Sequence, residues 1–222
     1  MSGIRRQALA VARRDLARER RRGEVLWVTV PFGIIALLLV PLAIGTDQAT
    51  LHRVGPGLYW VVVLLFGVLV GVRGAADETG PQRDAAALLG LDPVAVFAGR
   101  ALATSSLLVV FELVVGVAAI ALYDIDLIGV GWLALVVLLV AIGLGTLATI
   151  ASSIVASGAG TAALVPLLVA PLAIPLLLGA TQSLDGLRQG TSILSWILLM
   201  IVVVLVLGIV GVVSSGPLQE SR

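Results

Sequence analysis

The chain has 222 residues, of which 59% are hydrophobic and 12% are charged, whereas about 25% of the residues of a soluble domain are charged. The composition therefore indicates a membrane protein. The sequence contains 14 arginines and no lysine, so it lacks the residue that reaches nucleotide phosphates in a Walker A motif. The absence of cysteine excludes disulfide bonds, thiolate metal sites and cysteine nucleophiles. We therefore expect a non-catalytic transmembrane subunit and not an ATPase or another enzyme.

Six runs of mainly apolar residues approach the roughly 20 residues that a helix needs to cross a bilayer. They are 25–44, 57–72, 101–122, 132–154, 162–180 and 193–213. The second run is short, but it extends if Arg73 reaches the head groups with its charged end. The first run is too long for the apolar part of a signal peptide. We predict an all-α polytopic membrane protein with six transmembrane helices in residues 25–213.

The arginines are distributed unevenly over the segments that flank these runs. With the N-terminus inside the cell, 12 of the 14 arginines lie in inner segments, and only Arg53 and Arg188 lie in outer ones. Cytoplasmic segments of membrane proteins collect basic residues, so we expect both termini to be cytoplasmic. The expected outer loops are 45–56, 123–131 and 181–192, and the expected inner segments are the loops 73–100 and 155–161 and the tail 214–222.

The N-terminal segment 1–24 is strongly basic, with eight arginines among its first 22 residues. From Ile4 to Arg22, a helical wheel separates an apolar side from an arginine-rich side, as in helices that lie on a membrane surface. The apolar side consists of Ile4, Ala8, Leu9, Val11, Ala12 and Leu16. We expect an amphipathic interfacial helix on the inner leaflet. The alternative is a basic segment without fixed structure that only sets the orientation.

The long inner loop 73–100 contains the signals of a short helix between two turns. Thr79-Gly80-Pro81 is typical of a turn with proline at the first helical position, and residues 82–89 are rich in Ala and Leu. Gly90 and Asp92-Pro93 are expected to end this helix.

The chain lacks a phosphate-binding lysine, so its energy must arrive mechanically from a nucleotide-binding partner, and loop 73–100 is the inner connection long enough to hold a docking helix. The predicted coupling residues are Glu78, Gly80, Leu88, Leu89, Asp92 and Pro93. The alternative is a connecting loop that needs only to be soluble.

Glu112 is the ionisable residue in the middle of an apolar run. Placing it there costs about 2.5–3.5 kcal/mol on insertion scales, so we expect it to face a protein interior or a water-filled cavity. It is a candidate for a substrate pathway or a subunit contact, or it accepts a structural hydrogen bond from a neighbouring helix. The apolar runs offer no second carboxylate and no histidine for a proton relay, which argues against a proton-coupled transporter.

Two other features of the apolar runs bear on packing. Pro166, Pro171 and Pro175 each remove a backbone donor from the fifth run, so this run is either kinked or broken, with residues after Pro175 re-entering from the outer side. Small residues at four-residue spacing favour close helix packing, with dimerisation as the alternative. They are Gly67 and Gly71 in the second run and Gly145, Thr149 and Ser153 in the fourth.

Several short motifs follow one another in an order that is specific as a set. They are Arg13-Arg14-Asp15-Leu16, Pro56-Gly57-Leu58-Tyr59-Trp60-Val61, Glu78-Thr79-Gly80, Leu88-Leu89-Gly90-Leu91-Asp92-Pro93, Phe97-Ala98-Gly99-Arg100, and the proline-rich stretch from Pro166 to Pro175. Over roughly residues 13–180 the chain thus resembles the haem exporter protein B family (CcmB-type) of cytochrome c maturation, the membrane permease of an ABC transporter.

This resemblance implies an ABC-2-like permease fold, a homodimer of this chain and a cytoplasmic ABC ATPase subunit that binds ATP. It also implies a haem-handling membrane subunit, a small membrane accessory protein, and the plasma membrane of a bacterium as the location. The implied function couples ATP hydrolysis to haem export or to release of a haem-loaded chaperone in cytochrome c biogenesis. We expect no nucleic acid partner and no bound metal; haem is a possible substrate.

The sequence departs from the family pattern near Arg73 and in residues 157–161, so an ABC-2-type exporter of a lipid, glycan or drug is the alternative function. Glu112, Trp60 and the three prolines of the fifth run are the pathway candidates. His52 is either a surface histidine or a haem contact. An intramembrane hydrolase is excluded because the runs contain no catalytic constellation of Ser and His or of paired carboxylates.

Overall fold

The computed structural model describes residues 2–23, 25–45, 47–77, 90–124, 129–155, 161 and 163–216. Within this part of the chain all regular structure is helical. The elements are α1 (Ser2–Arg22), a π-helical turn η1 (Val25–Thr29), α2 (Val30–Ile44), α3 (Gln48–Asp77), α5 (Pro93–Tyr123), α6 (Val130–Ile154), α7 (Leu164–Gln189) and α8 (Leu194–Ser215). The chain is thus an all-α, multi-pass membrane protein.

Five of the described helices, α3 and α5 to α8, are long and apolar enough to cross a membrane. The apolar stretch Trp27–Ala43, which contains most of α2, is shorter. Helix α2 ends at Ile44, and the next residue, Gly45, has a φ of 96° that does not continue the helix. The count of six spanning helices therefore remains a prediction, although each of the six apolar runs lies mainly in a helix.

Three of the expected loop boundaries are wrong. Residues 48–56 and 181–189 are helical instead of forming outer loops, and α5 begins at Pro93, so the inner connection is shorter than 73–100. Polar residues at these places end the apolar runs but not the helices, because a helix ends where a cap satisfies its backbone.

Asp47 forms such a cap at the start of α3. Its Oδ2 accepts hydrogen bonds from the Thr50 backbone N at 3.0 Å and from the Thr50 hydroxyl at 2.6 Å. These hydrogen bonds hold the pKa of Asp47 below its usual range. The cap places the start of α3 at Gln48, nine residues before the start of the predicted span.

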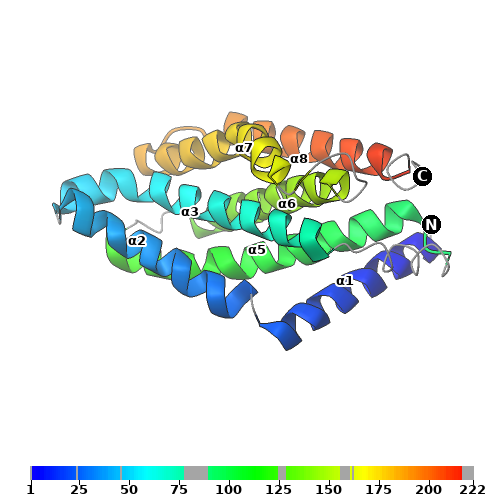
Figure 1. Ribbon diagram of the computed structural model, residues 1–222. Coiled ribbons are helices and arrows are strands. Elements are labelled where there is room, and N and C mark those ends of the chain that lie inside the picture. The colour runs from blue at the N-terminus through cyan, green and yellow to red at the C-terminus, as the bar shows by residue number, and fades with distance from the viewer. Residues whose placement is uncertain are drawn as a thin grey trace.

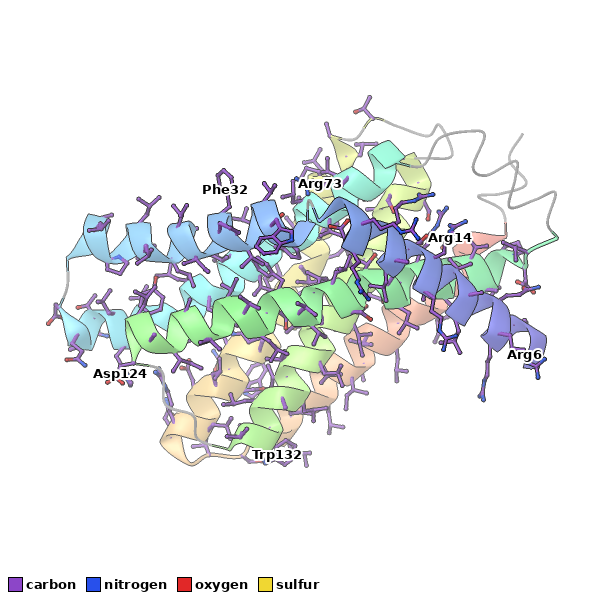
Figure 2. All side chains as sticks on the ribbon, turned by 90° about the horizontal axis from the view of Figure 1, so that it is seen from below. Arg6, Arg14, Phe32, Arg73, Asp124 and Trp132 are labelled. Carbon is purple, nitrogen blue, oxygen red and sulfur yellow. The ribbon has the colours of Figure 1, made fainter. Side chains whose placement is uncertain are left out.

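The spanning helices form a bundle with α6 at its centre. Helix α6 packs against α3, α5, α7 and α8, while α2 lies on α3 and α5. Figure 1 shows the N- and C-terminal ends of the described chain at the same end of the bundle. Arg6, Arg14 and Arg73 lie toward this end and Asp124 lies at the opposite one (Figure 2).

The small residues on α3 and α6 are used for packing within the chain, as predicted. A Cβ at Gly71 would lie 2.8 Å from Val165 Cγ1, and one at Gly67 would lie 3.4 Å from Leu144. On α6, Gly145 meets Ser105 of α5 at still shorter distances. These faces are therefore occupied by neighbouring helices of the same chain.

Helix α7 continues as one helix from Leu164 to Gln189, with Pro171 and Pro175 inside it. Pro166 lies in its first turn, where a backbone donor has no partner inside the helix. The alternative of a re-entrant segment after Pro175 is therefore wrong. Neighbouring helices α3, α6 and α8 support α7 along its length.

Candidate functional site

The start of α5 is a rigid structure at the arginine-rich end. Asp92 has extended backbone angles and its Oδ1 accepts from the Val94 backbone N at 2.8 Å, which is the geometry of an N-cap. Pro93 follows at the first helical position, where its fixed φ suits the helix. Gly90, with a φ of 62°, reverses the chain just before this cap. The sequence predicted that Gly90 and Asp92-Pro93 end a helix over residues 82–89, which lie outside the described residues; the structure shows that Asp92-Pro93 begins α5.

The structure describes only some of the predicted coupling residues. Asp92 and Pro93 are described, whereas Glu78, Gly80, Leu88 and Leu89 lie outside the described residues. Arg73, near the end of α3, is partly buried, and its Nη1 has no hydrogen-bond partner among the described residues.

Helix α1 packs along the first half of α5, a contact that the sequence did not predict. Val11 and Ala12 are buried there, and a Cβ at Gly99 would lie 2.6 Å from the Ala8 carbonyl oxygen. The Asp92 backbone N also donates to Gln7 Oε1 at 3.2 Å. Helix α1 is therefore attached to the capped start of α5. Gly99 is the sequence signal for this contact, but it does not say which helix comes close.

This contact divides the predicted apolar side of α1. Val11 and Ala12 face α5 instead of lipid, whereas Leu9 and Ile4 are exposed. On the helical wheel, the residues that contact α5 and the exposed apolar residues fall on one side of the helix. They could not be separated from the sequence, because hydrophobicity alone does not distinguish a protein contact from a lipid contact.

Glu112 lies in the interior between α5 and its neighbours, with 1% of its surface exposed. Within the part of the chain that the structure describes, neither carboxyl oxygen has a hydrogen-bond partner. The Tyr59 hydroxyl donates at 3.0 Å to the backbone carbonyl oxygen of Glu112 and not to its side chain. The expected shielding from lipid is thus observed, whereas the alternative of a structural hydrogen bond to the carboxyl group is not found among the described residues.

Trp60 lies on α3 next to Tyr59, the residue that contacts the Glu112 backbone. It is buried, its ring packs edge-on against Tyr59 with centroids 4.7 Å apart, and its Nε1 has no hydrogen-bond partner. Phe66 of α3 and Phe111 of α5 stack with centroids 3.7 Å apart. The α3–α5 contact therefore links Trp60 and Glu112 through Tyr59. The sequence did not single out Tyr59, because its role depends on which helices are neighbours.

The three prolines are not part of this group. Pro166, Pro171 and Pro175 belong to α7, which packs chiefly on α3, α6 and α8. Their proposed role in a pathway stays a prediction.

The opposite end of the bundle carries His52, now in the first turns of α3 and not in a loop. Its backbone carbonyl oxygen accepts from Arg188 Nη2 at 3.1 Å, and Gln48 donates to Asp124 Oδ2 at 3.2 Å. The two arginines expected in outer loops thus differ, because Arg188 holds α3 to α7 while Arg53 is exposed. A haem contact by His52 remains a prediction.

The family model described as CcmB protein matches residues 6–216, which is nearly the whole chain. Comparison with curated proteins finds no match.

Proposed function

Because the chain belongs to the CcmB protein family, and is thus a membrane component of the haem-exporter type, we propose that it is the permease subunit of an ABC transporter. In this proposal it couples ATP hydrolysis by a separate cytoplasmic subunit to haem export or to release of a haem-loaded chaperone in cytochrome c biogenesis. The family match over residues 6–216 carries the proposal. The lack of lysine supports the assignment of nucleotide binding to a partner subunit.

The geometry supports a coupling site at the arginine-rich end. Helix α3 ends at Asp77 and α5 begins at Pro93, directly after the Asp92 cap. From this cap α5 runs as one helix to Tyr123 and passes Glu112 on the way. A displacement of the connection would therefore reach the bundle interior through α5, and also α1 through Gln7.

Release of a chaperone fits the described interior better than passage of haem through one chain. Haem iron is usually held by His, Cys, Met or Tyr. The two described tyrosines both donate to backbone carbonyl oxygens, Tyr59 to that of Glu112 and Tyr123 to that of Leu37 at 2.6 Å. We propose that a second copy of this chain, a haem-handling membrane subunit and a small accessory protein complete the complex.

The coupling proposal is tested with the double variant Glu78→Arg, Leu89→Asp. It should insert in the membrane but lose either the ATPase subunit from the purified complex or the stimulation of its ATP turnover. The reason is that the charge at residue 78 is reversed and the apolar side chain at residue 89 is replaced by a charged one. ATPase retention, ATP turnover and cytochrome c yield are the measurements.

The matched control is Gln189→Arg, Leu194→Asp, which introduces arginine and aspartate, as the test variant does, at exposed positions of the opposite end. It should behave as wild type. A Glu78→Arg, Leu89→Asp variant with a bound ATPase and full cytochrome c yield would contradict the coupling site. A variant that loses the ATPase while cytochrome c yield is unchanged would contradict the haem function.

The proposed location is the plasma membrane of a bacterium with both termini cytoplasmic, and the natural absence of cysteine allows a direct test. Cysteines introduced at Ala49 and Gln189, both exposed at the arginine-poor end, should react with an impermeant thiol reagent added outside intact cells. A cysteine at the exposed Thr161 should react only after the cells are opened. The reverse labelling pattern would invert the topology.

A further inference from the structure

One face of α1 carries arginines that the bundle does not use. Arg6, Arg13 and Arg20 are exposed and follow one another at seven-residue spacing, which places them nearly in line after two helical turns. Leu9, with 49% of its surface exposed, lies on the neighbouring line of the helix. We call these four residues the arginine face of α1.

The other face of α1 is fixed by the contact of Val11 and Ala12 with α5. The arginine face therefore has a defined direction, away from the bundle. Among the described residues, the ion pair on α1 joins Arg14 Nε to Asp15 Oδ1 at 3.0 Å. The three arginines of the arginine face make no ion pair in this part of the chain, so their charges are available to an anionic partner.

Aromatic and apolar side chains continue this surface toward α2. Trp27 is 82% exposed and Phe32 is 67% exposed. The Trp27 ring lies over the end of α1, since a Cβ at Gly23 would be 2.6 Å from its Cδ1. In Figure 2, Arg6 lies at the far end of α1, and Phe32 lies on α2 beyond the junction of the two helices. Along the chain the surface thus changes from positive, through an exposed indole, to apolar.

We propose that the arginine face of α1 binds the head groups of anionic phospholipids, with Trp27 at the boundary between head groups and acyl chains. Juxtamembrane arginines are attracted to anionic lipid, and tryptophan is enriched at this boundary. A lipid leaflet matches the whole sequence of positive, aromatic and apolar surface. An acidic soluble protein would match only the arginines and would not account for the exposed Trp27 indole between the positive and the apolar surface.

The test uses the full chain in vesicles and the fluorescence of Trp27, taken as the difference between wild type and Trp27→Phe. Phosphatidylglycerol brominated on its acyl chains should quench this fluorescence more than brominated phosphatidylcholine at the same mole fraction. The triple variant Arg6→Gln, Arg13→Gln, Arg20→Gln should lose the preference, by about fivefold in local enrichment for each arginine. The corresponding triple lysine variant should keep it, and high salt should weaken it.

Arg53→Gln is the matched control, because it removes one exposed charge at the opposite end. The single variant Arg13→Gln should weaken the lipid preference, whereas Arg53→Gln should leave it unchanged. An equal loss in the two variants would mean that net charge, and not the arginine face, determines binding. Equal quenching by the two lipids in wild type would overturn the proposal. So would a triple glutamine variant that keeps the lipid preference but loses a copurifying ATPase subunit, since the arginine face would then bind protein.

Discussion

Replacing Gly145 by alanine should strongly destabilise the bundle, although the same change in an exposed helix is stabilising. A Cβ at this position would collide with Ser105 Oγ, and it would lie 2.8 Å from Ser105 N and 2.9 Å from Ser105 Cα. Two of these atoms belong to the backbone of α5, so the clash is not relieved by a side-chain rotation. Helices α5 and α6 must move apart, and α6 is the helix on which α3, α7 and α8 also pack.

The expected size follows from two opposing effects. Overpacking of a well-packed interior typically costs about 1–3 kcal/mol, and a backbone contact belongs at the upper end of this range. Alanine in place of glycine gains roughly 1 kcal/mol in helix propensity, which offsets only part of the cost. The midpoint of thermal unfolding in detergent, and the fraction of the chain recovered as a single species, should both decrease.

Gly208→Ala is the matched control. Gly208 lies inside α8, and a Cβ there would have no heavy atom within 4 Å. This variant should unfold at the same temperature as wild type or slightly higher. If Gly145→Ala were as stable as Gly208→Ala, the close approach of α5 and α6 would be wrong.

The Gly145 contact also illustrates what the sequence could predict about the fold. The four-residue spacing of Gly145, Thr149 and Ser153 indicated a small face and hence close packing. It could not indicate Ser105 as the partner, because helix spacing gives the face of one helix and not the identity of its neighbour. In the same way, the apolar runs predicted that the helices exist, while caps such as Asp47 and Asp92 determine where they begin.

For the candidate site, the sequence predicted which side chain is buried better than it predicted which residues contact one another. The cost of a charge in a bilayer was enough to place Glu112 in the interior. The position of Tyr59 against the Glu112 backbone, and the contact of α1 with α5, depend on tertiary packing and have no local signature. The prediction for Val11 and Ala12 failed for this reason, since a buried face and a lipid face have the same composition.

Replacing Glu112 by leucine should make the protein more stable and less active. Both carboxyl oxygens are buried without a hydrogen-bond partner in the described ranges, and an unsatisfied buried polar group costs about 1–3 kcal/mol. Leucine removes this cost and has a similar volume, so the unfolding midpoint of Glu112→Leu should increase. Glutamine keeps an unsatisfied polar group, so Glu112→Gln should unfold close to wild type.

Activity should change in the opposite direction if the carboxyl group acts in the transport cycle. Helix α5 connects Glu112 to the proposed coupling site at Asp92, so Glu112→Leu should reduce the stimulation of the ATPase and the cytochrome c yield, while Glu112→Gln should retain more of both. The measurements are the unfolding midpoint in detergent, ATP turnover of the purified complex and cytochrome c yield in cells.

Ser183→Ala separates these two effects. Ser183 is fully buried on α7, and its hydroxyl also lacks a partner, so removing it should stabilise the protein and leave activity unchanged. A Glu112→Leu variant less stable than wild type would mean that the carboxyl group has a partner in the assembled complex. A Glu112→Leu variant that is both more stable and fully active would show that Glu112 has no role in the transport cycle. The carboxyl group would then lower the stability of the protein without any gain in activity.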